Sequence, residues 1–328
     1  MIEQRAIAVV IPAYRVSGQI VALIARIPDS VDWIFVVDDA CPERSAELVL
    51  ESIRDPRVTV IRHAINLGVG AATVTGIRAA IECAADIVVK LDGDAQYDPE
   101  LIPYLVQPIV DGSADVTKGN RFFFLEDVTQ MPTVRLLGNA MLSFVNKGVS
   151  GYWDLMDPTN GFIALHSAVL RMLPLDKLDN RYFFESDLLF RLATVRAVVQ
   201  DLPLRAHYAD EQSSLGIGGV VLSFPGKYLN RLAKRLFYNH LLRDFNLGSA
   251  GLIIGLFLLV TGSSIGIYEW IQSYATGKPA TAGTVMLVAL QLIVSLNLLI
   301  LFLTVDIGNV PRRVVHRAVL NQPPRVPR

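Results

Sequence analysis

Carboxylates follow two apolar, strand-like runs of this sequence, at the point where each run ends. Asp92 and Asp94 come directly after the run Ile87–Leu91, with the small residue Gly93 between them. Carboxylate oxygens are the ligands that hard divalent ions prefer, so the pair predicts a Mg²⁺ or Mn²⁺ site that would bridge the oxygens of a diphosphate. An Asp-X-Asp motif alone is a weak signal, because surface turns often carry such residues.

Asp38 and Asp39 end an earlier apolar run, Trp33–Val37. Adjacent carboxylates at this point can accept hydrogen bonds from the N–H of a uracil or guanine base and from ribose hydroxyls. The competing interpretation is a helix N-cap, a role that Asp39 would fill in part.

Residues 6–120 alternate between apolar runs and segments with helical spacing. The runs that predict buried parallel strands are Ala6–Ile11, Trp33–Val37, Val58–Ile61 and Ile87–Leu91. The segments that predict helices are Gln19–Ile27, Ser45–Arg54 and Gly70–Cys83. This alternation predicts an α/β fold with a mostly parallel sheet, helices on both faces and ligands beyond the carboxyl ends of the strands. Residues 121–215 predict a more irregular region, with a strand at Gly161–Leu165 and a helix near Glu185–Thr194.

Two long apolar segments predict transmembrane helices. Residues 248–271 carry no charge before Glu269, and residues 283–305 carry none. Each segment can cross a hydrocarbon core of about 30 Å, and buried core helices are the alternative. Basic residues gather on both outer flanks, whereas the connecting loop holds only Lys278. The positive-inside rule therefore predicts an integral inner or plasma membrane protein with a cytoplasmic catalytic domain and both termini in the cytoplasm.

The segment before the first span, residues 216–247, predicts amphipathic helices on an anionic membrane surface, with an ordinary packed helix as the alternative. The sequence thus divides into a cytosolic catalytic domain (1–215), interfacial helices (216–247), a hairpin of two spans (248–305) and a basic cytosolic tail (306–328). The net charge of −1 gives no overall field that would favour nucleic acid. Cys41 and Cys83 are the only cysteines, which fits a reducing compartment.

Several short motifs occur in a fixed order along the chain. They are Pro12-Ala13-Tyr14, Asp38-Asp39, Asn66-Leu67-Gly68, Asp92-Gly93-Asp94-Ala95-Gln96, Lys118-Gly119-Asn120-Arg121-Phe122, Asp157-Pro158-Thr159-Asn160-Gly161-Phe162 and Phe183-Phe184-Glu185-Ser186-Asp187. In this order the chain resembles the inverting family 2 glycosyltransferases of the GT-A fold, and among them the polyprenyl-phosphate sugar synthases. The resemblance covers nearly the whole chain.

The resemblance implies a role for each matching residue. The donor-binding residues would be Pro12, Ala13, Tyr14, Asp38, Asp39, Asn66, Gly68, Asp92, Gly93 and Gln96. Asp92 and Asp94 would hold Mg²⁺ or Mn²⁺, with Asp94 the more direct ligand. The lipid phosphate would meet Arg121, Arg135 and Lys234, and the catalytic group would comprise Asp94, Arg121, Asp157, Glu185 and Asp187.

The expected reaction is inverting transfer of one sugar from a nucleotide-sugar to undecaprenyl or dolichyl phosphate. A phosphate monoester has its second pKa near about 6 and is largely dianionic at neutral pH, so it needs little help from a general base. Asp157 would then orient the sugar or stabilise charge at the anomeric carbon, with Glu185 and Asp187 as the competing candidates. A homo-oligomer and a downstream flippase are further partners that the resemblance implies.

Departures from the family pattern lie around the donor, where Arg15, Ala40 and Val69 replace the usual residues. The nucleotide and the sugar therefore stay open, with a UDP-sugar preferred over a GDP-sugar. One alternative is a processive polysaccharide synthase, but no tryptophan of this chain ends a Gln-X-X-Arg-Trp motif. The other is a non-catalytic membrane scaffold with a transferase-like domain, which the intact acidic and basic residues argue against.

Overall fold

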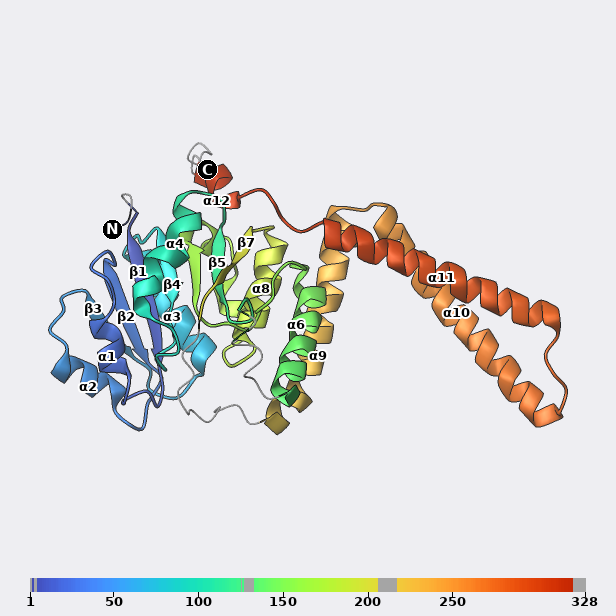
Figure 1. Cartoon of the computed structure of the whole chain (residues 1–328), viewed down its shortest axis with the longest axis horizontal. Helices are drawn as coiled ribbons and strands as arrows, with labels where there is room; N and C mark the ends of the chain where they lie inside the picture. The colour runs from blue at the N-terminus through green and yellow to red at the C-terminus, as the bar shows by residue number, and fades with distance from the viewer. Residues whose placement is uncertain (1, 3–4, 125, 127–132, 206–216, 321–328) are drawn as a thin grey trace. The chain divides into compact units, whose positions relative to one another are not determined.

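A computed structural model describes residues 2, 5–124, 126, 133–205 and 217–320 (Figure 1). For residues 133–135, 217–223 and 320 it describes the backbone alone. The contacts divide the chain into two compact units, Met1–Arg231 with Pro311–Arg328, and Leu232–Val310. We call the first the catalytic unit and the second the hairpin unit.

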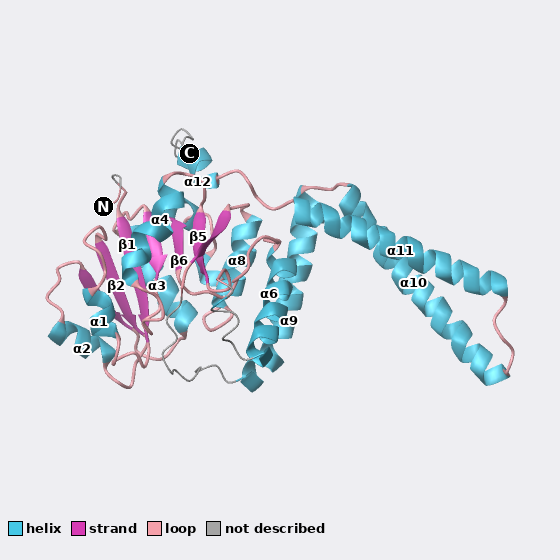
Figure 2. Ribbon diagram, in the orientation of Figure 1, coloured by secondary structure: helices cyan, strands magenta, loops and turns pink. Residues whose placement is uncertain are grey.

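A seven-stranded sheet forms the centre of the catalytic unit (Figure 2). The strands, in the order in which they lie side by side, are β3 (Val58–Arg62), β2 (Trp33–Asp38), β1 (Ile7–Ala13), β4 (Ile87–Lys90), β6 (Ile163–His166), β5 (Val116–Asn120) and β7 (Val199–Pro203). All neighbours are parallel except β6, which is antiparallel to both β4 and β5. The mostly parallel sheet expected from the alternating pattern is confirmed.

Helices cover both faces of the sheet, as expected. Helices α1 (Ile20–Ala25), α2 (Ser45–Ser52) and α4 (Ile102–Val110) share one apolar core with alternate residues of β1, β2 and β4. Helix α3 (Val69–Glu82) covers the other side of β1, where Gly76 packs directly on Val10, and it contacts α8 (Phe184–Thr194). Strands β1, β2 and β4 are buried on both faces because both are covered, which explains their continuous apolar runs.

The reversed direction of β6 is what assembles the site. Because β6 is antiparallel to its neighbours, its first residues lie beside the last residues of β4 and β5. Ile163 pairs with Lys90 on one side and with Lys118 on the other. The segment that leads into β6, residues 157–162, is therefore held between the carboxyl ends of β4 and β5.

The expectation of an irregular region over residues 121–215 is wrong in part. It contains α6 (Thr133–Ser150) and β7, besides the expected β6 and α8 and the short helices α7 (Ser167–Leu170) and η2 (Leu175–Lys177). Helix α6 escapes a pattern search for core helices because many of its apolar side chains face outward: Leu137, Met141 and Phe144 are all exposed. Another short helix, η1 (Pro99–Leu101), precedes α4.

The hairpin unit consists of two long apolar helices and the helical segment before them. Helix α9 (Ile217–Arg235) continues into the π-helix η3 (Leu236–Arg243), and α10 (Leu247–Thr276) and α11 (Ala282–Gly308) follow. Both α10 and α11 are long and apolar enough to cross a membrane. Ser295 of α11 donates to the carbonyl of Gly255 at 2.8 Å, and Gln291 of α11 donates to Thr261 at 2.6 Å, so two polar side chains join α11 to α10. Asn297 instead bonds to its own helix.

A buried ionic cluster closes the base of the hairpin unit. The guanidinium of Arg235 donates to both carboxylate oxygens of Asp306 at 2.8 Å, and the ring of His240 lies 2.9 Å from the same carboxylate. All three side chains are buried. The cluster therefore ties α9 and η3 to the end of α11.

The chain returns to the catalytic unit after the hairpin. Helix α12 (Val315–Leu320) lies against α7, and its backbone N–H groups at Val315 and His316 donate to the buried carboxylate of Asp115, just before β5. The ring of His316 also binds Asp115 and stacks on His166, with ring centroids 4.2 Å apart. The tail expected to be a separate segment is thus part of the catalytic unit as far as residue 320.

Candidate active site

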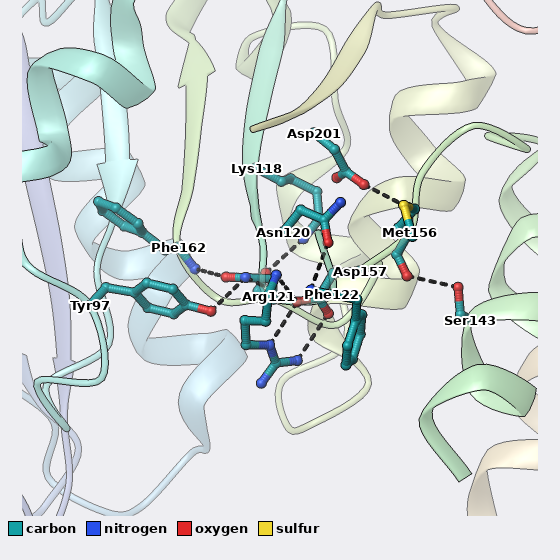
Figure 3. A network of polar contacts seen from close by, with 11 residues as sticks. Tyr97, Lys118, Asn120, Arg121, Phe122, Ser143, Met156, Asp157, Phe162 and Asp201 are labelled. Carbon is teal, nitrogen blue, oxygen red and sulfur yellow. Dashed lines mark hydrogen bonds and ion pairs between the residues drawn. The ribbon is translucent and has the colours of Figure 1, made fainter. Parts of the chain in front are cut away.

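Arg121 and Asp157 form an ion pair with two hydrogen bonds at the carboxyl end of β5 (Figure 3). The Nε of Arg121 donates to Asp157 Oδ2 at 2.7 Å, and its Nη2 donates to Oδ1 at 2.9 Å. The side chain of Asp157 is 0% exposed. Burial would raise the pKa of Asp157, but the charge and hydrogen bonds of Arg121 outweigh it and hold the pKa below its ordinary value. Asp157 is therefore a carboxylate that orients Arg121.

Asn160 and Lys118 fix the turn that carries Asp157. The amide of Asn160 donates to Asp157 Oδ2 at 3.1 Å and to the hydroxyl of Tyr97 at 2.6 Å. The buried ammonium of Lys118 donates to the backbone carbonyl of Asn160 at 2.7 Å, and its burial lowers its pKa. The neighbouring Asp201 is mostly buried, and that burial raises its pKa to about 6. The turn is therefore held from the strand side before any substrate binds.

Lys90 joins two of the predicted acids at the end of β4. Its Nζ lies 2.6 Å from Asp92 Oδ1 and 3.1 Å from Glu185 Oε1, at the first turn of α8. Burial would lower the pKa of Lys90, but the two carboxylates outweigh it and raise the pKa. The structure thus brings Asp92 and Glu185 together through a lysine.

Asp94 lies in the turn that follows. Its Oδ1 accepts a hydrogen bond from the backbone N–H of Gln96 at 3.1 Å, and its side chain is half-buried. Among the described residues no group of three His, Cys, Asp or Glu side chains could hold an ion. Mg²⁺ sites that include substrate phosphates commonly use only one or two carboxylates, so the donor set of Asp94 and Asp92 fits such an ion. Lys90 already occupies one oxygen of Asp92, which favours Asp94 as the direct ligand.

The acids at the end of β2 organise their own loops. Asp38 accepts hydrogen bonds from the backbone N–H groups of Cys41 and Ala46 and so stabilises the start of α2. Asp39 accepts from the N–H groups of Leu67 and Gly68. Both carboxylates are buried and paired within the protein, and a direct contact of either with a nucleoside stays a prediction.

The loop that Asp39 holds includes the other predicted donor residues. Asn66 donates to the carbonyl of Asp39 at 3.1 Å. Gly68 has φ +104°, and a Cβ there would lie 2.4 Å from the carbonyl oxygen of Asn180, so only glycine fits. Gly68 donates to Asp39 and packs against the backbone of Asn180, and these two contacts explain why the motif ends in glycine.

The end of β1 supplies the remaining donor candidates. Pro12 and Ala13 are buried, and the carbonyl of Ala13 accepts from the N–H of Asp39 at 3.1 Å. Tyr14 is 42% exposed, with the guanidinium of Arg15 5.5 Å from its ring centre. Gly93 lies against the side chain of Val16. The motifs at the ends of β1 and β2 thus touch each other, and Tyr14 is the exposed aromatic ring among them.

Asp187 is buried and paired within the protein, and the catalytic role expected of it stays a prediction. Its side chain is 0% exposed, and its oxygens accept from Arg231 at 2.6 Å, from Arg191 at 3.1 Å and from the backbone N–H of Asp179. Three donors and complete burial leave Asp187 as a tie between α8 and α9. The sequence pattern placed Asp187 two residues after Glu185, and in a helix such residues point in different directions.

Arg135 and Lys234 are the other two residues that the resemblance assigns to the lipid phosphate. Arg135 belongs to α6, and its side chain lies outside the described residues. Lys234 is exposed on the part of α9 that belongs to the hairpin unit. Their contact with a lipid phosphate stays a prediction.

An apolar pocket opens beside the Arg121–Asp157 ion pair. It has a volume of about 440 Å³ and is lined by Phe122, Leu136, Asn139, Ala140, Ser143, Phe144, Lys147 and Met156. Phe122 follows Arg121 directly, and Met156 precedes Asp157. Ser143 of α6 donates to the carbonyl of Met156 at 2.9 Å and so fixes the pocket wall (Figure 3). The paired charges therefore lie next to a cavity that suits an apolar ligand.

Comparison with known proteins identifies the family. Residues 8–173, which include β1 to β6 and most of this site, match the model of glycosyl transferase family 2. This chain belongs to glycosyltransferase family 2. The resemblance seen in the motifs is thereby confirmed, and the protein is a glycosyltransferase by family.

Relatives of this family 2 glycosyltransferase include two named lipid-linked transferases. The chain is 27% identical over 224 residues to the UDP-N-acetylglucosamine–dolichyl-phosphate N-acetylglucosaminyltransferase of Methanococcus voltae, covering 64% of this chain and 89% of the relative. It is 27% identical over 216 residues to the undecaprenyl-phosphate mannosyltransferase of Micrococcus luteus, covering 65% and 88%.

Solved structures support the fold of this glycosyltransferase. Glucosyl-3-phosphoglycerate synthase from Mycobacterium tuberculosis, in complex with UDP, superposes with a TM-score of 0.53 at 22% identity, covering 70% of this chain and 81% of that one. The expected GT-A type of sheet is confirmed by this likeness.

Three residues that hold the site together have no role assigned by the sequence motifs. Lys90 ends the apolar strand Ile87–Lys90, and Lys118 is the middle residue of the strand Val116–Asn120. A lysine in a strand must find a partner when it is buried. That signal was available in the sequence. Tyr97, in contrast, reaches Asn160 across 63 residues of chain, and no local pattern predicts such a contact.

Proposed function

We propose that this family 2 glycosyltransferase moves a single sugar from a nucleotide-sugar to a polyprenyl phosphate. The observation that carries the proposal is the apolar pocket beside Arg121 and Asp157, at the carboxyl ends of the strands that form the family's site. The names of the Methanococcus voltae and Micrococcus luteus relatives support dolichyl or undecaprenyl phosphate as the acceptor. A UDP-sugar is the preferred donor.

The acceptor side follows from the charges and the cavity. Isoprene units near the phosphate would occupy the pocket under α6, and the phosphate would lie toward Arg121. Arginine is suited to this because its planar group can grip phosphate oxygens while it stays bound to a carboxylate. Asp157 holds that guanidinium at a fixed angle, so the arginine is oriented before the lipid arrives.

The reaction is an in-line displacement at the anomeric carbon. An oxygen of the lipid phosphate forms the new bond to that carbon, and the bond from the carbon to the β-phosphate oxygen breaks. The nucleoside diphosphate leaves, and the configuration at the anomeric carbon of the transferred sugar is inverted. The acceptor is already dianionic near neutral pH, so no residue has to remove a proton. A lowered pKa and complete burial make Asp157 a poor base in any case.

Asp94 and Asp92 would hold Mg²⁺ or Mn²⁺, which would neutralise charge on the leaving diphosphate. The Mycobacterium tuberculosis synthase has been solved with Mn²⁺ and UDP-glucose, which supports this assignment by analogy of fold. The exposed ring of Tyr14 at the end of β1 would contact the nucleoside base.

The membrane supplies the lipid, and α10 with α11 would anchor the enzyme there. A hairpin of two spans leaves the chain on the side from which it entered, and α12 is bound to the catalytic unit. Together with the basic flanks, this supports the proposal that the catalytic unit and the tail both face the cytoplasm. Oligomer formation and a downstream flippase remain proposals from the family resemblance.

A turnover screen tests this function. Detergent-purified protein is incubated with Mn²⁺, undecaprenyl phosphate and a panel of UDP- and GDP-sugars, and mass spectrometry detects glycosylated lipid. We expect one donor to give product, and EDTA or Asp94→Ala to lower the rate at least about 100-fold. Glu100→Ala, which removes an exposed acid six residues away, should leave the rate unchanged. A folded protein that binds UDP and gives no product with any donor contradicts the proposal.

A further inference from the structure

Lys90 is a buried cation between two acids on opposite sides of the site. Its side chain is 2% exposed, and it forms ion pairs with Asp92 on the strand side and Glu185 on the helix side. Charged groups are rarely buried unless they are paired, and the loss of one partner is costly for the other. Lys90 therefore holds both carboxylates in place.

The position of Asp92 is limited from two directions. Its Oδ1 accepts from Lys90, and its Oδ2 lies so close to the backbone at Gly161 that a Cβ there would be only 1.8 Å away. Lys90 also donates to the carbonyl of Gly161 at 3.4 Å. Lys90 and the backbone that leads into β6 thus set the orientation of Asp92.

Lys90 also changes the charge beside the proposed ion. Asp92, Asp94 and Glu185 would carry three negative charges, and the ammonium of Lys90 offsets one of them. A cation is bound more tightly when a nearby positive charge is removed. The lysine would therefore weaken the hold on the ion, and with it the hold on the nucleoside diphosphate that shares the ion.

We infer that Lys90 is a positioning residue that fixes Asp92 for the donor and keeps the ion and the departing nucleoside diphosphate from binding too tightly. This inference rests on the proposed function for its donor and its ion. The residue acts through Asp92 and does not itself touch the substrate.

The test measures Mn²⁺ binding directly, apart from turnover. Full-length protein in detergent is titrated with Mn²⁺ in the presence of UDP, and free Mn²⁺ is followed by electron paramagnetic resonance. We expect Lys90→Met to lower the dissociation constant for Mn²⁺ at least about fivefold and to lower kcat at least about tenfold. Lys177→Met is the control, because it removes an exposed lysine outside the site, and it should leave Mn²⁺ affinity unchanged.

The double variant Lys90→Met with Glu185→Gln separates charge from position. It has the same net charge at the site as the wild type, so its Mn²⁺ affinity should return to within about twofold of the wild type. Asp92 is still not held, so kcat should stay at least about tenfold low. The double variant leaves no unpaired glutamate, so it also carries the test if Lys90→Met alone fails to fold.

Two results would overturn the inference. One is full turnover by the double variant, which would make Lys90 a purely structural residue. The other is a wild type that forms glycolipid but binds no Mn²⁺, which leaves the transferase proposal standing. The reverse case, in which the variants rank as expected in Mn²⁺ binding but no donor gives glycolipid, supports the inference and contradicts the proposed acceptor.

Discussion

At the scale of single residues, the site is a set of buried charges that are already paired. Asp157 is bound by Arg121, and Asp92 is bound by Lys90. Carboxylates held in this way keep one orientation, because each would have to lose a charged hydrogen bond to move. Such preorganisation suits a reaction in which a phosphate dianion must approach an anionic donor.

Asp157→Asn should separate orientation from base catalysis. We expect kcat to fall about 10- to 100-fold because the amide cannot accept the two hydrogen bonds from Arg121, while the shape of the pH–rate profile is unchanged. Initial rates of glycolipid formation between pH 5.5 and 9 measure both quantities. Asp154→Asn, an exposed acid of the same loop, is the control. Loss of the acidic limb of the profile in Asp157→Asn would show that Asp157 is a base.

At the scale of elements, helix α6 has an inner face that is bound to the catalytic unit and an outer face that is apolar and exposed. Its inner face is fastened by Ser143 to the Met156 carbonyl and by Asn146 to the hydroxyl of Tyr228 in α9. Its outer face presents large apolar side chains, among them Met141 at 70% and Leu137 at 71% exposure. A soluble protein seldom leaves such a face uncovered, and a lipid or membrane surface would cover it.

Ala140→Trp should fill the pocket under α6 without disturbing the donor. Ala140 lines the pocket and is exposed, so the protein can fold with the larger tryptophan side chain at this position. We expect the KM for undecaprenyl phosphate to rise at least about tenfold, with the Kd for UDP unchanged within about twofold. Rates at varied lipid concentration and UDP titration by calorimetry measure the two. An unchanged KM for the lipid would exclude this pocket as its binding site. Ala22→Trp, at an exposed alanine of α1 outside the pocket lining, is the control.

The sequence predicted those elements whose patterns are local. Strands β1, β2 and β4 consist mainly of continuous apolar runs, and the order of the motifs places their polar ends at one edge of the sheet. Helix α6 was missed because Leu137 and Met141 follow a helical period yet face outward. The pairing of Arg121 with Asp157 spans 36 residues and depends on the reversed direction of β6, which no local spacing encodes.

Asp38, Asp39 and Asp187 are acids whose hydrogen-bond partners the sequence motifs could not predict. Each carboxylate is buried and satisfied by donors from its own surroundings. A sequence motif reveals that an acid is present at a strand or helix end, but it does not reveal whether backbone N–H groups or arginines use its oxygens. Only the folded contacts distinguish a carboxylate that supports the site from one that contacts substrate.

At the scale of the whole molecule, residues far apart in sequence join in the catalytic unit. The buried carboxylate of Asp115 accepts hydrogen bonds from Val198, Val315 and His316. Burial opposes ionisation, but the His316 ring and the N–H groups outweigh it, so the pKa of Asp115 lies below its ordinary value. One carboxylate therefore holds the start of β5, the strand β7 and the segment after the hairpin.

Asp115→Ala should lower the stability of the catalytic unit by about 2–4 kcal/mol, because several buried N–H donors would lose their hydrogen-bond acceptor at once. Thermal unfolding in detergent, followed by intrinsic fluorescence, measures the change. Asp111→Ala is the control, since this exposed side chain binds Gln107 and only its backbone carbonyl accepts from Arg317. Equal melting temperatures for Asp115→Ala and the wild type would mean that α12 is not bound in solution.

The docking of α12 has a consequence for how the chain responds to cleavage. The loop between α10 and α11, residues 277–281, is the only connection between them at that end, so a protease that cuts it produces two polypeptides. The first ends with α10 and the second begins with α11, yet α10 packs along α11, Asp306 binds Arg235, and Asp115 binds α12. The fragments would therefore remain one particle through purification and separate only in denaturant, as a protein reassembled from complementary halves does.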